Sequence, residues 1–328
     1  MRLAVIIPCF NEEETLPVVV QSIPREIAGI DEVDVVVVDD GSSDNTAEVA
    51  RSLGVQCIVR FPRNRGLAAA FAAGLETALA RDADVIVNTD GDKQYPQADI
   101  PRLIAPILSG DADIVVGDRQ TMTVTHFSPL KKALQQFGSW TIRRLSSTDI
   151  PDAASGFRAY SREAALRLNI VTEFSYVIET ILQASYKGLR IASLPVQTNP
   201  RTRKSRLFPN IWVYVRRSGE TALRVYMIYR PLRVFTVLGL IPILAGLGLM
   251  ARYLYFLVGD INPSGHIQSL IVASVLLVSG VQVVLFGLLA ELVAINRKLL
   301  EDMLYRLRSN RLWTQHPQDT EYETSGQP

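Results

Sequence analysis

Apolar and polar positions alternate with two different periods along the first 200 residues of this 328-residue chain. Short apolar runs end in polar loops and are followed by segments with helical spacing, which predicts strands alternating with helices. The predicted strands are 3–7, 33–38, 56–60, 85–88 and 113–116. The predicted helices begin near Thr15 and Thr46 and cover 67–80. This order is typical of an α/β domain with a mixed, mostly parallel sheet and helices on both faces.

Beyond residue 230 the pattern changes to long apolar segments. Residues 234–251 and 269–290 contain no charged side chain, and each segment is long enough to span a membrane as a helix. Turn-forming residues at 259–265 join them, which predicts a transmembrane hairpin with helices at about 232–258 and 267–292. Glycines suited to close helix packing are Gly239, Gly246, Gly248, Gly280 and Gly287.

Basic residues flank both apolar segments, so the positive-inside rule places both ends of the hairpin in the cytoplasm. We therefore expect a multi-pass protein of the inner or plasma membrane with both termini inside. The predicted parts are the α/β domain at 1–205, amphipathic juxtamembrane helices at 206–231, the hairpin at 232–295, and a cytoplasmic helix and tail at 296–328. The last helix is expected to pack on the α/β domain or on a second subunit, so a homo-oligomer is an open possibility.

Composition excludes several classes of function. The formal net charge is only +1, which is unlike the basic field of a nucleic-acid-binding protein. No phosphate-binding loop of the ATPase type and no dinucleotide fingerprint follows a predicted strand. Cys9 and Cys57 lack the spacing of a metal site, so we interpret them as reduced structural thiols.

The candidate chemistry lies where the predicted strands end. Asp90 and Asp92 follow the strand 85–88 and are separated by Gly91. Carboxylates at this edge of an α/β sheet suit Mg²⁺ or Mn²⁺ that takes its other ligands from water and a diphosphate. Polar pairs at the ends of other strands are expected at the same edge, and they are Asn11-Glu12, Asp39-Asp40 and Asp118-Arg119.

Six segments in a specific order carry a resemblance to a known family. They are Pro8-Cys9-Phe10-Asn11-Glu12, Val36-Val37-Val38-Asp39-Asp40-Gly41-Ser42, Asn64-Arg65-Gly66, Asp90-Gly91-Asp92-Lys93-Gln94-Tyr95-Pro96, Gly117-Asp118-Arg119 and Ser155-Gly156-Phe157-Arg158. Residues 1 to about 205 resemble a family 2 glycosyltransferase with the GT-A fold. The whole chain resembles polyprenyl-phosphate sugar transferases of the dolichol-phosphate-mannose synthase type.

The resemblance implies roles for individual residues. Those expected to contact a nucleotide-sugar donor are Pro8, Asn11, Glu12, Asp39, Asp40, Arg65 and Asp90. Asp90 and Asp92 are the expected ligands of Mg²⁺ or Mn²⁺. The catalytic group is expected to comprise Asp92, Gln94, Asp118, Arg119 and Asp152. The expected contacts of the acceptor phosphate are Arg119, Ser155, Arg158, Arg201, Arg203 and Lys204.

These features predict a membrane-anchored, inverting glycosyltransferase that moves a sugar from a UDP- or GDP-linked donor to polyprenyl (undecaprenyl or dolichyl) phosphate. A phosphate acceptor is already an anion near neutral pH, so direct in-line attack on the sugar needs no general base. If the acceptor were a lipid hydroxyl, Asp118 or Asp152 would be the candidate base. Transfer to such a hydroxyl and a non-catalytic sugar-nucleotide-binding membrane scaffold remain as alternatives. The sugar and the nucleotide stay undecided.

Overall fold

The computed structural model describes residues 1–120, 140, 143, 146, 148–171, 176–199, 211–259 and 267–314. The chain forms two compact units, one of Met1–Leu223 with Leu304–Pro328 and one of Arg224–Met303. Arg201, Arg203 and Lys204 lie outside the described residues.

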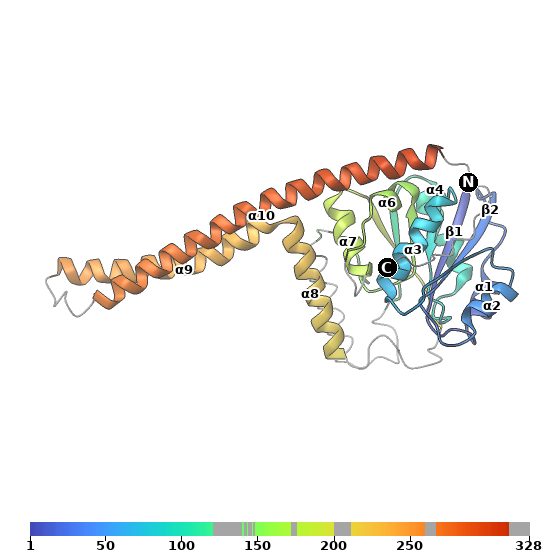
Figure 1. Ribbon diagram of the computed structural model, residues 1–328, viewed down its shortest axis with the longest axis horizontal. Helices are drawn as coiled ribbons and strands as arrows, with labels where there is room; N and C mark the ends of the chain where they lie inside the picture. Colours follow the sequence, from blue (N-terminus) through green and yellow to red (C-terminus); the bar gives the residue numbers. More distant parts are fainter. Residues whose placement is uncertain are drawn as a thin grey trace. The chain divides into compact units, whose positions relative to one another are not determined.

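The first unit is built on a seven-stranded sheet with the strand order β3-β2-β1-β4-β6-β5-β7. Figure 1 labels its strands β1 and β2 and the helices around the sheet. The strands are β1 Arg2–Cys9, β2 Glu32–Asp39, β3 Cys57–Arg60, β4 Val85–Asn88, β5 Ile114–Asp118, β6 Arg158–Ser161 and β7 Ile191–Pro195. Strand β6 runs antiparallel to β4 and β5, whereas the other neighbouring strands are parallel. The predicted mixed, mostly parallel sheet is therefore confirmed, although the sequence pattern did not reveal β6 or β7.

Helices cover both faces of this sheet. They are α1 Leu16–Ser22, α2 Thr46–Ser52, α3 Leu67–Ala80, α4 Ile100–Leu108, α6 Arg162–Arg167 and α7 Tyr176–Tyr186, with a 3₁₀ turn at Gln97–Asp99. On one face, apolar residues of α1 and α4 share a core with Leu3, Val5 and Ile7 of β1. On the other face α3 packs closely on the sheet, because a Cβ at Gly74 would lie 2.3 Å from Ile6 Cγ2. Strands β1 and β2 are buried on both faces, which explains their continuous apolar runs.

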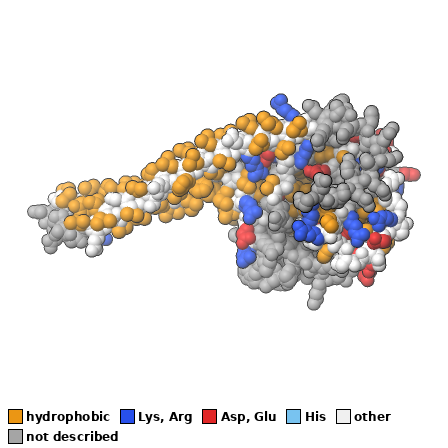
Figure 2. All heavy atoms as spheres, in the orientation of Figure 1, with side chains coloured by type: hydrophobic (Ala, Val, Ile, Leu, Met, Phe, Trp, Pro, Cys, Tyr) orange, Lys and Arg blue, Asp and Glu red, His pale blue; other side chains and the backbone are white. Residues whose placement is uncertain are grey.

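The helices after this domain are α8 Ile211–Tyr229, α9 Pro231–Val258 and α10 Ile267–Thr314. Among the described residues, α9 and the part of α10 up to Ser309 are long and apolar enough to cross a membrane. Hydrophobic side chains cover their surface (Figure 2). The helix expected after residue 295 is continuous with the second apolar segment, because α10 runs without a break for 48 residues.

Glycines allow α9 and α10 to pack against each other within the second unit. A Cβ at Gly239 would lie 2.8 Å from the Gly280 carbonyl oxygen, and one at Gly287 would lie 2.7 Å from Phe235 Cβ. A Cβ at Gly246 would likewise lie 3.0 Å from Leu277 Cγ. Gly248 has no atom within 4 Å of its Cβ position, so its predicted packing role is not found. The hairpin is thus a close-packed helix pair with an apolar exterior, as expected for a membrane anchor.

Candidate active site

The carboxyl ends of β1, β2, β4 and β5 lie at one edge of the sheet. β1 is parallel to β2 and β4, and β5 has the same direction because both β4 and β5 are antiparallel to β6. Pro8 is buried in β1 opposite Val38. The four polar strand ends identified in the sequence therefore meet at this edge.

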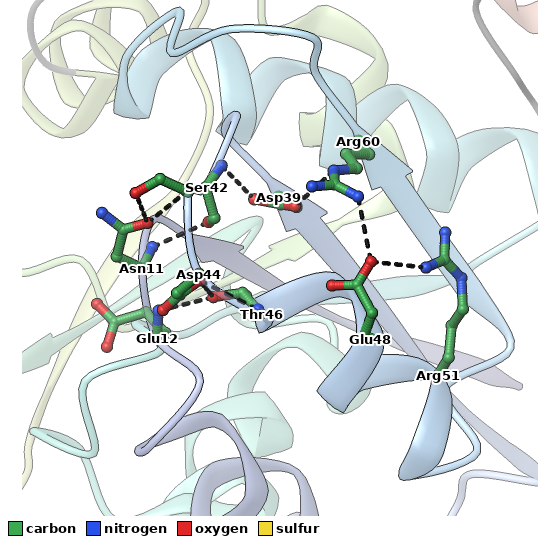
Figure 3. Close-up of polar contacts among 10 residues, drawn as sticks. Asn11, Glu12, Asp39, Ser42, Asp44, Thr46, Glu48, Arg51 and Arg60 are labelled. Carbon is green, nitrogen blue, oxygen red and sulfur yellow. Dashed lines mark hydrogen bonds and ion pairs between the residues drawn. The ribbon is translucent and has the colours of Figure 1, made fainter.

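The loops after β1 and β2 are joined by hydrogen bonds (Figure 3). The Asn11 amide N–H donates to Ser42 Oγ at 2.9 Å, and the Ser43 amide N–H donates to Asn11 Oδ1 at 2.8 Å. The Glu12 amide N–H donates to Thr46 Oγ1 at 2.8 Å. Asn11 has a φ of 57°, a left-handed conformation that asparagine tolerates better than most residues. These two loops form one connected layer on the β1–β2 side of the site.

Asp39 is fully buried at the end of β2, where Oδ1 accepts a hydrogen bond and Oδ2, without a hydrogen bond among the described residues, makes an ion pair. Its Oδ1 accepts a hydrogen bond from the Ser42 amide at 2.9 Å. Its Oδ2 lies 3.2 Å from Nε of Arg60, and Nη1 of Arg60 lies 3.3 Å from Glu48 Oε1 (Figure 3). A donor nucleoside that uses Asp39 must therefore compete with or join the ion pair with Arg60.

Asp40 holds the beginning of α3. Its Oδ1 accepts from the Arg65 amide at 2.7 Å and its Oδ2 from the Gly66 amide at 2.9 Å. Burial raises the pKa of Asp40, and these two hydrogen bonds oppose that rise. The guanidinium of Arg65 lies over the Phe61 ring, 4.8 Å from its centroid. Both Asp40 oxygens thus hold the backbone immediately before α3, which begins at Leu67.

The loop after β4 presents Asp90 and Asp92. Asp92 Oδ1 accepts from the Gln94 amide at 3.0 Å across Lys93, which has a φ of 62°. The Asn199 amide donates in turn to the Gln94 carbonyl at 3.0 Å. The Gln94 backbone therefore holds the turn on which Asp92 is placed.

Asp90 is the most strongly perturbed carboxyl group of this loop. Burial raises its pKa to about 7, the charges of Asp92 and Glu12 add to the rise, and Arg119 opposes it. Two neighbouring carboxylates with few positive partners favour a bound cation, because a cation relieves both burial of charge and mutual repulsion. The described residues contain no group of three or more His, Cys, Asp and Glu suited to a metal. Hard oxygen donors of this kind fit Mg²⁺ or Mn²⁺.

Arg119, directly after β5, forms a bidentate pair with Asp152. Its Nε donates to Oδ2 at 2.6 Å and its Nη2 to Oδ1 at 2.9 Å. Burial alone raises the pKa of Asp152, but the charge and hydrogen bonds of Arg119 outweigh burial and hold that pKa below its usual value. Asp152 is therefore a weak base in this arrangement. Asp118 Oδ1 accepts from the Gln120 amide at 2.9 Å, which makes a tight turn after the strand.

Arg158 and Ser155 occupy positions that differ from those expected of phosphate ligands. Both side chains are fully buried. Within the described residues, the Arg158 guanidinium donates to the carbonyl oxygens of Ala153, Ser155 and Val177 and to Thr180 Oγ1, at 2.7–2.9 Å. These bonds hold the buried Arg158 guanidinium against the loop backbone and α7, and its expected contact with the acceptor phosphate stays a prediction.

A model of the family described as glycosyl transferase family 2 matches residues 4–168. The chain belongs to this family. It is 32% identical over 211 residues to a dolichyl-phosphate hexose transferase of Haloferax volcanii, covering 63% of this chain and 87% of that protein. It is 27% identical over 310 residues to a dodecaprenyl-phosphate galacturonate synthase of Rhizobium johnstonii, covering 90% and 88% of the two chains.

Solved structures agree with the fold. A glucosyl-3-phosphoglycerate synthase from Mycobacterium tuberculosis, solved with Mn²⁺, UDP-glucose and phosphoglyceric acid, matches with a TM-score of 0.54 and 20% identity. The match covers 69% of this chain and 78% of that one. At this identity the likeness establishes the architecture of the glycosyltransferase domain, namely the mixed sheet with its helices.

Several residues that shape the site of this glycosyltransferase were missed from the sequence. Asn88 is buried at the end of β4 and donates to the Gly156 carbonyl at 2.9 Å and to Tyr176 Oη at 2.7 Å. Tyr95 Oη accepts from the Gly156 amide at 3.2 Å. A polar amide that ends an apolar strand was the available signal for Asn88. Tyr176 offered none, because its contact with Asn88 spans 88 residues of sequence.

Proposed function

We propose that this family 2 glycosyltransferase moves a sugar from a nucleotide-sugar to a polyprenyl phosphate at a membrane surface. The observation that carries the proposal is the carboxylate pair Asp90 and Asp92, within electrostatic reach of Arg119 at one sheet edge. The chain continues from this domain into two apolar helices that fit a membrane anchor. Relatives named for transfer to dolichyl and dodecaprenyl phosphate support a lipid phosphate as the acceptor.

In this proposal Asp90 and Asp92 bind Mg²⁺ or Mn²⁺, which neutralises negative charge on the departing nucleoside diphosphate. Glu12 and Asp39 line the nucleoside side, where a carboxylate accepts from base or ribose groups. Arg119 binds the acceptor phosphate, because a guanidinium matches phosphate oxygens in a bidentate manner. Asp152 orients Arg119 through their paired hydrogen bonds.

A base-free reaction is consistent with the state of the carboxyl groups. Asp152 is ionised, but its low pKa and its pair with Arg119 make it a poor proton acceptor. A lipid phosphate needs no deprotonation near neutral pH, so positioning and charge neutralisation suffice for in-line attack with inversion. We further propose that the hairpin keeps both termini, and hence the donor site, on the cytoplasmic side.

The test is a transfer assay on the full chain purified in detergent. Undecaprenyl phosphate, undecaprenol and diacylglycerol are each offered with labelled UDP- and GDP-sugars, with and without EDTA. We expect one donor to give an organic-extractable product with the phosphate acceptor, and EDTA to abolish it. Product with an alcohol acceptor instead would support transfer to a hydroxyl. Metal-dependent nucleotide binding without any product would support a non-catalytic scaffold.

A further inference from the structure

Gly156 lies directly against the metal-binding carboxylate. A Cβ at this position would lie 3.1 Å from Asp90 Oδ1, 3.3 Å from Asp90 Oδ2 and 3.3 Å from Tyr176 Oη. The φ of Gly156 is not in the left-handed region, so the backbone itself tolerates other residues, and a side chain there requires Asp90 or Tyr176 to shift by a few tenths of an ångström. The backbone at Gly156 is therefore packed directly against the Asp90 carboxylate.

Buried side chains form hydrogen bonds with the backbone of this loop. Arg158 is fully buried, and it donates from Nη2 to the Ala153 carbonyl at 2.9 Å and from Nε to the Ser155 carbonyl at 2.8 Å. Its Nη1 donates to the Val177 carbonyl and to Thr180 Oγ1, both in the N-terminal half of α7. Asn88 and Tyr95 hold the carbonyl and the amide of Gly156. The loop position is thus determined by partners on β4, α7 and the metal loop.

The same loop also carries the partner of Arg119. Asp152 begins it, and its Oδ1 accepts from the Ala154 amide at 3.2 Å as well as from Arg119. One short segment, 152–157, therefore contacts the carboxylate proposed to bind the metal and the arginine proposed to bind the acceptor phosphate. A shift of this loop moves both groups together.

We propose that Gly156 and Arg158 are positioning residues that hold Asp90 and the Asp152–Arg119 pair in place. This inference rests on the proposed function only where it names the metal and the acceptor phosphate as the groups bound by Asp90 and Arg119. Arg158 acts from inside the protein through the loop and touches no substrate. Gly156 acts through the absence of a side chain, because a methyl group there would displace the Asp90 carboxylate.

Two variants and two matched controls test the proposal in the full-length protein. Gly156→Ala adds one methyl group against Asp90, and Gly219→Ala adds one in α8 where no atom lies within 4 Å of the Cβ position. Arg158→Lys removes the planar donor fork. Arg162→Lys makes the same change near β6, where Arg162 donates to the Ala83 carbonyl and to Asp82 Oδ1. The probe is Mn²⁺ alone, titrated calorimetrically at a temperature where every variant is folded.

We expect Gly156→Ala to weaken Mn²⁺ binding by about 10- to 100-fold, the range seen when groups that orient metal ligands are changed. Arg158→Lys should weaken Mn²⁺ binding and also raise the KM for undecaprenyl phosphate, whereas both controls keep the wild-type Mn²⁺ affinity. The proposal is overturned if Gly156→Ala binds Mn²⁺ as the wild type does, or if Arg162→Lys weakens binding as much as Arg158→Lys. If the wild type binds Mn²⁺ but transfers no sugar to a polyprenyl phosphate, the proposed function fails while the Gly156→Ala comparison still decides this inference.

Discussion

The ends of β1 and β2 differ from the end of β4 in how their polar groups are satisfied. Asn11, Asp39 and Asp40 contact backbone amides or an arginine of the protein itself. At the end of β4, by contrast, the half-buried Asp90 lies beside a second carboxylate and has a pKa raised to about 7. Asn11 and Asp40 are largely satisfied without a ligand, and one Asp39 oxygen makes only an ion pair, whereas Asp90 gains most from a cation.

This difference separates residues that build the site from residues that act in it. A carboxylate with both oxygens bonded to amides contributes to stability, since breaking those bonds leaves partly buried amide donors without partners. Carboxylates that repel each other in a buried place cost stability and are typical of functional sites.

Removing a carboxylate from the end of β4 should have the largest effect. Asp92→Asn removes negative charge from the proposed metal site, and we expect turnover to fall by about 10²–10³-fold, comparable to losing one group that stabilises charge in the transition state. The measurement is sugar transfer at saturating donor. Circular dichroism checks that the variant is folded, and retention of more than a tenth of wild-type turnover would show that the metal is held elsewhere.

Breaking the Arg119 pair should have the next largest effect. Asp152→Asn leaves Arg119 with one neutral acceptor in place of a buried carboxylate, and we expect about a 10- to 100-fold loss, mainly as a raised KM for the lipid phosphate. A loss on the order of 10³-fold in kcat, with Mn²⁺ binding intact, would instead indicate a general base and contradict base-free transfer.

The affinity for Mn²⁺ should depend on pH through Asp90. Because burial and neighbouring carboxylates raise its pKa to about 7, Asp90 binds a proton below that pH and the metal must displace it. Below pH 7 we expect affinity to fall about tenfold per pH unit, with a plateau above it. The same shift makes the metal-free protein lose stability as pH rises from about 4 to 7, since the native state holds the proton more tightly than the unfolded state. Asp90→Asn should remove both trends, and their persistence in that variant would assign them to another group.

Asp40→Ala should affect stability more than catalysis. It removes the acceptor of the Arg65 and Gly66 amides, and we expect about 1–3 kcal/mol of lost stability, the cost of leaving partly buried amide donors without an acceptor. Urea unfolding of the full chain in detergent measures this, with Asp99→Ala, which loses a surface ion pair with Arg102 and no amide bond, as a control. An unchanged midpoint, together with a large loss of donor binding, would mean that Asp40 contacts the nucleotide.

Asp118→Asn should have the smallest effect. Its one described side-chain bond accepts from the Gln120 amide, and the asparagine oxygen can accept the same bond. We expect transfer within about tenfold of wild type, because no proton needs to be removed from a phosphate acceptor. A much larger loss would favour a hydroxyl acceptor with Asp118 as its base.

Much of the fold was readable from the sequence because its signals are local. The apolar runs of β1, β2 and β4 and the alanine-rich α3 were predicted close to their observed bounds. Strands β6 and β7 were missed because each is short and depends on partners far along the chain for its place in the sheet. The extra length of α10 was missed because charged residues interrupt its apolar pattern without ending the helix.

In the site, too, local signals were predicted from the sequence and long-range contacts were not. The strand-end pairs were readable because parallel strands place their carboxyl ends at one edge. The burial of Arg158 was not, since an arginine in a polar loop motif predicts a surface ligand as readily as a buried structural residue. Its partners Val177 and Thr180 lie 19 and 22 residues further along the chain and meet it only in the folded domain.

The most direct test of the account is a Mn²⁺ titration followed by electron paramagnetic resonance of free Mn²⁺. Wild-type protein, Asp90→Asn and Asp40→Asn are compared at pH 8, with and without UDP and GDP. We expect wild type and Asp40→Asn to bind Mn²⁺ with the same affinity, and Asp90→Asn to bind it at least about tenfold more weakly. Equal binding by Asp90→Asn, or loss of binding in Asp40→Asn alone, would contradict the assignment of the metal to the end of β4.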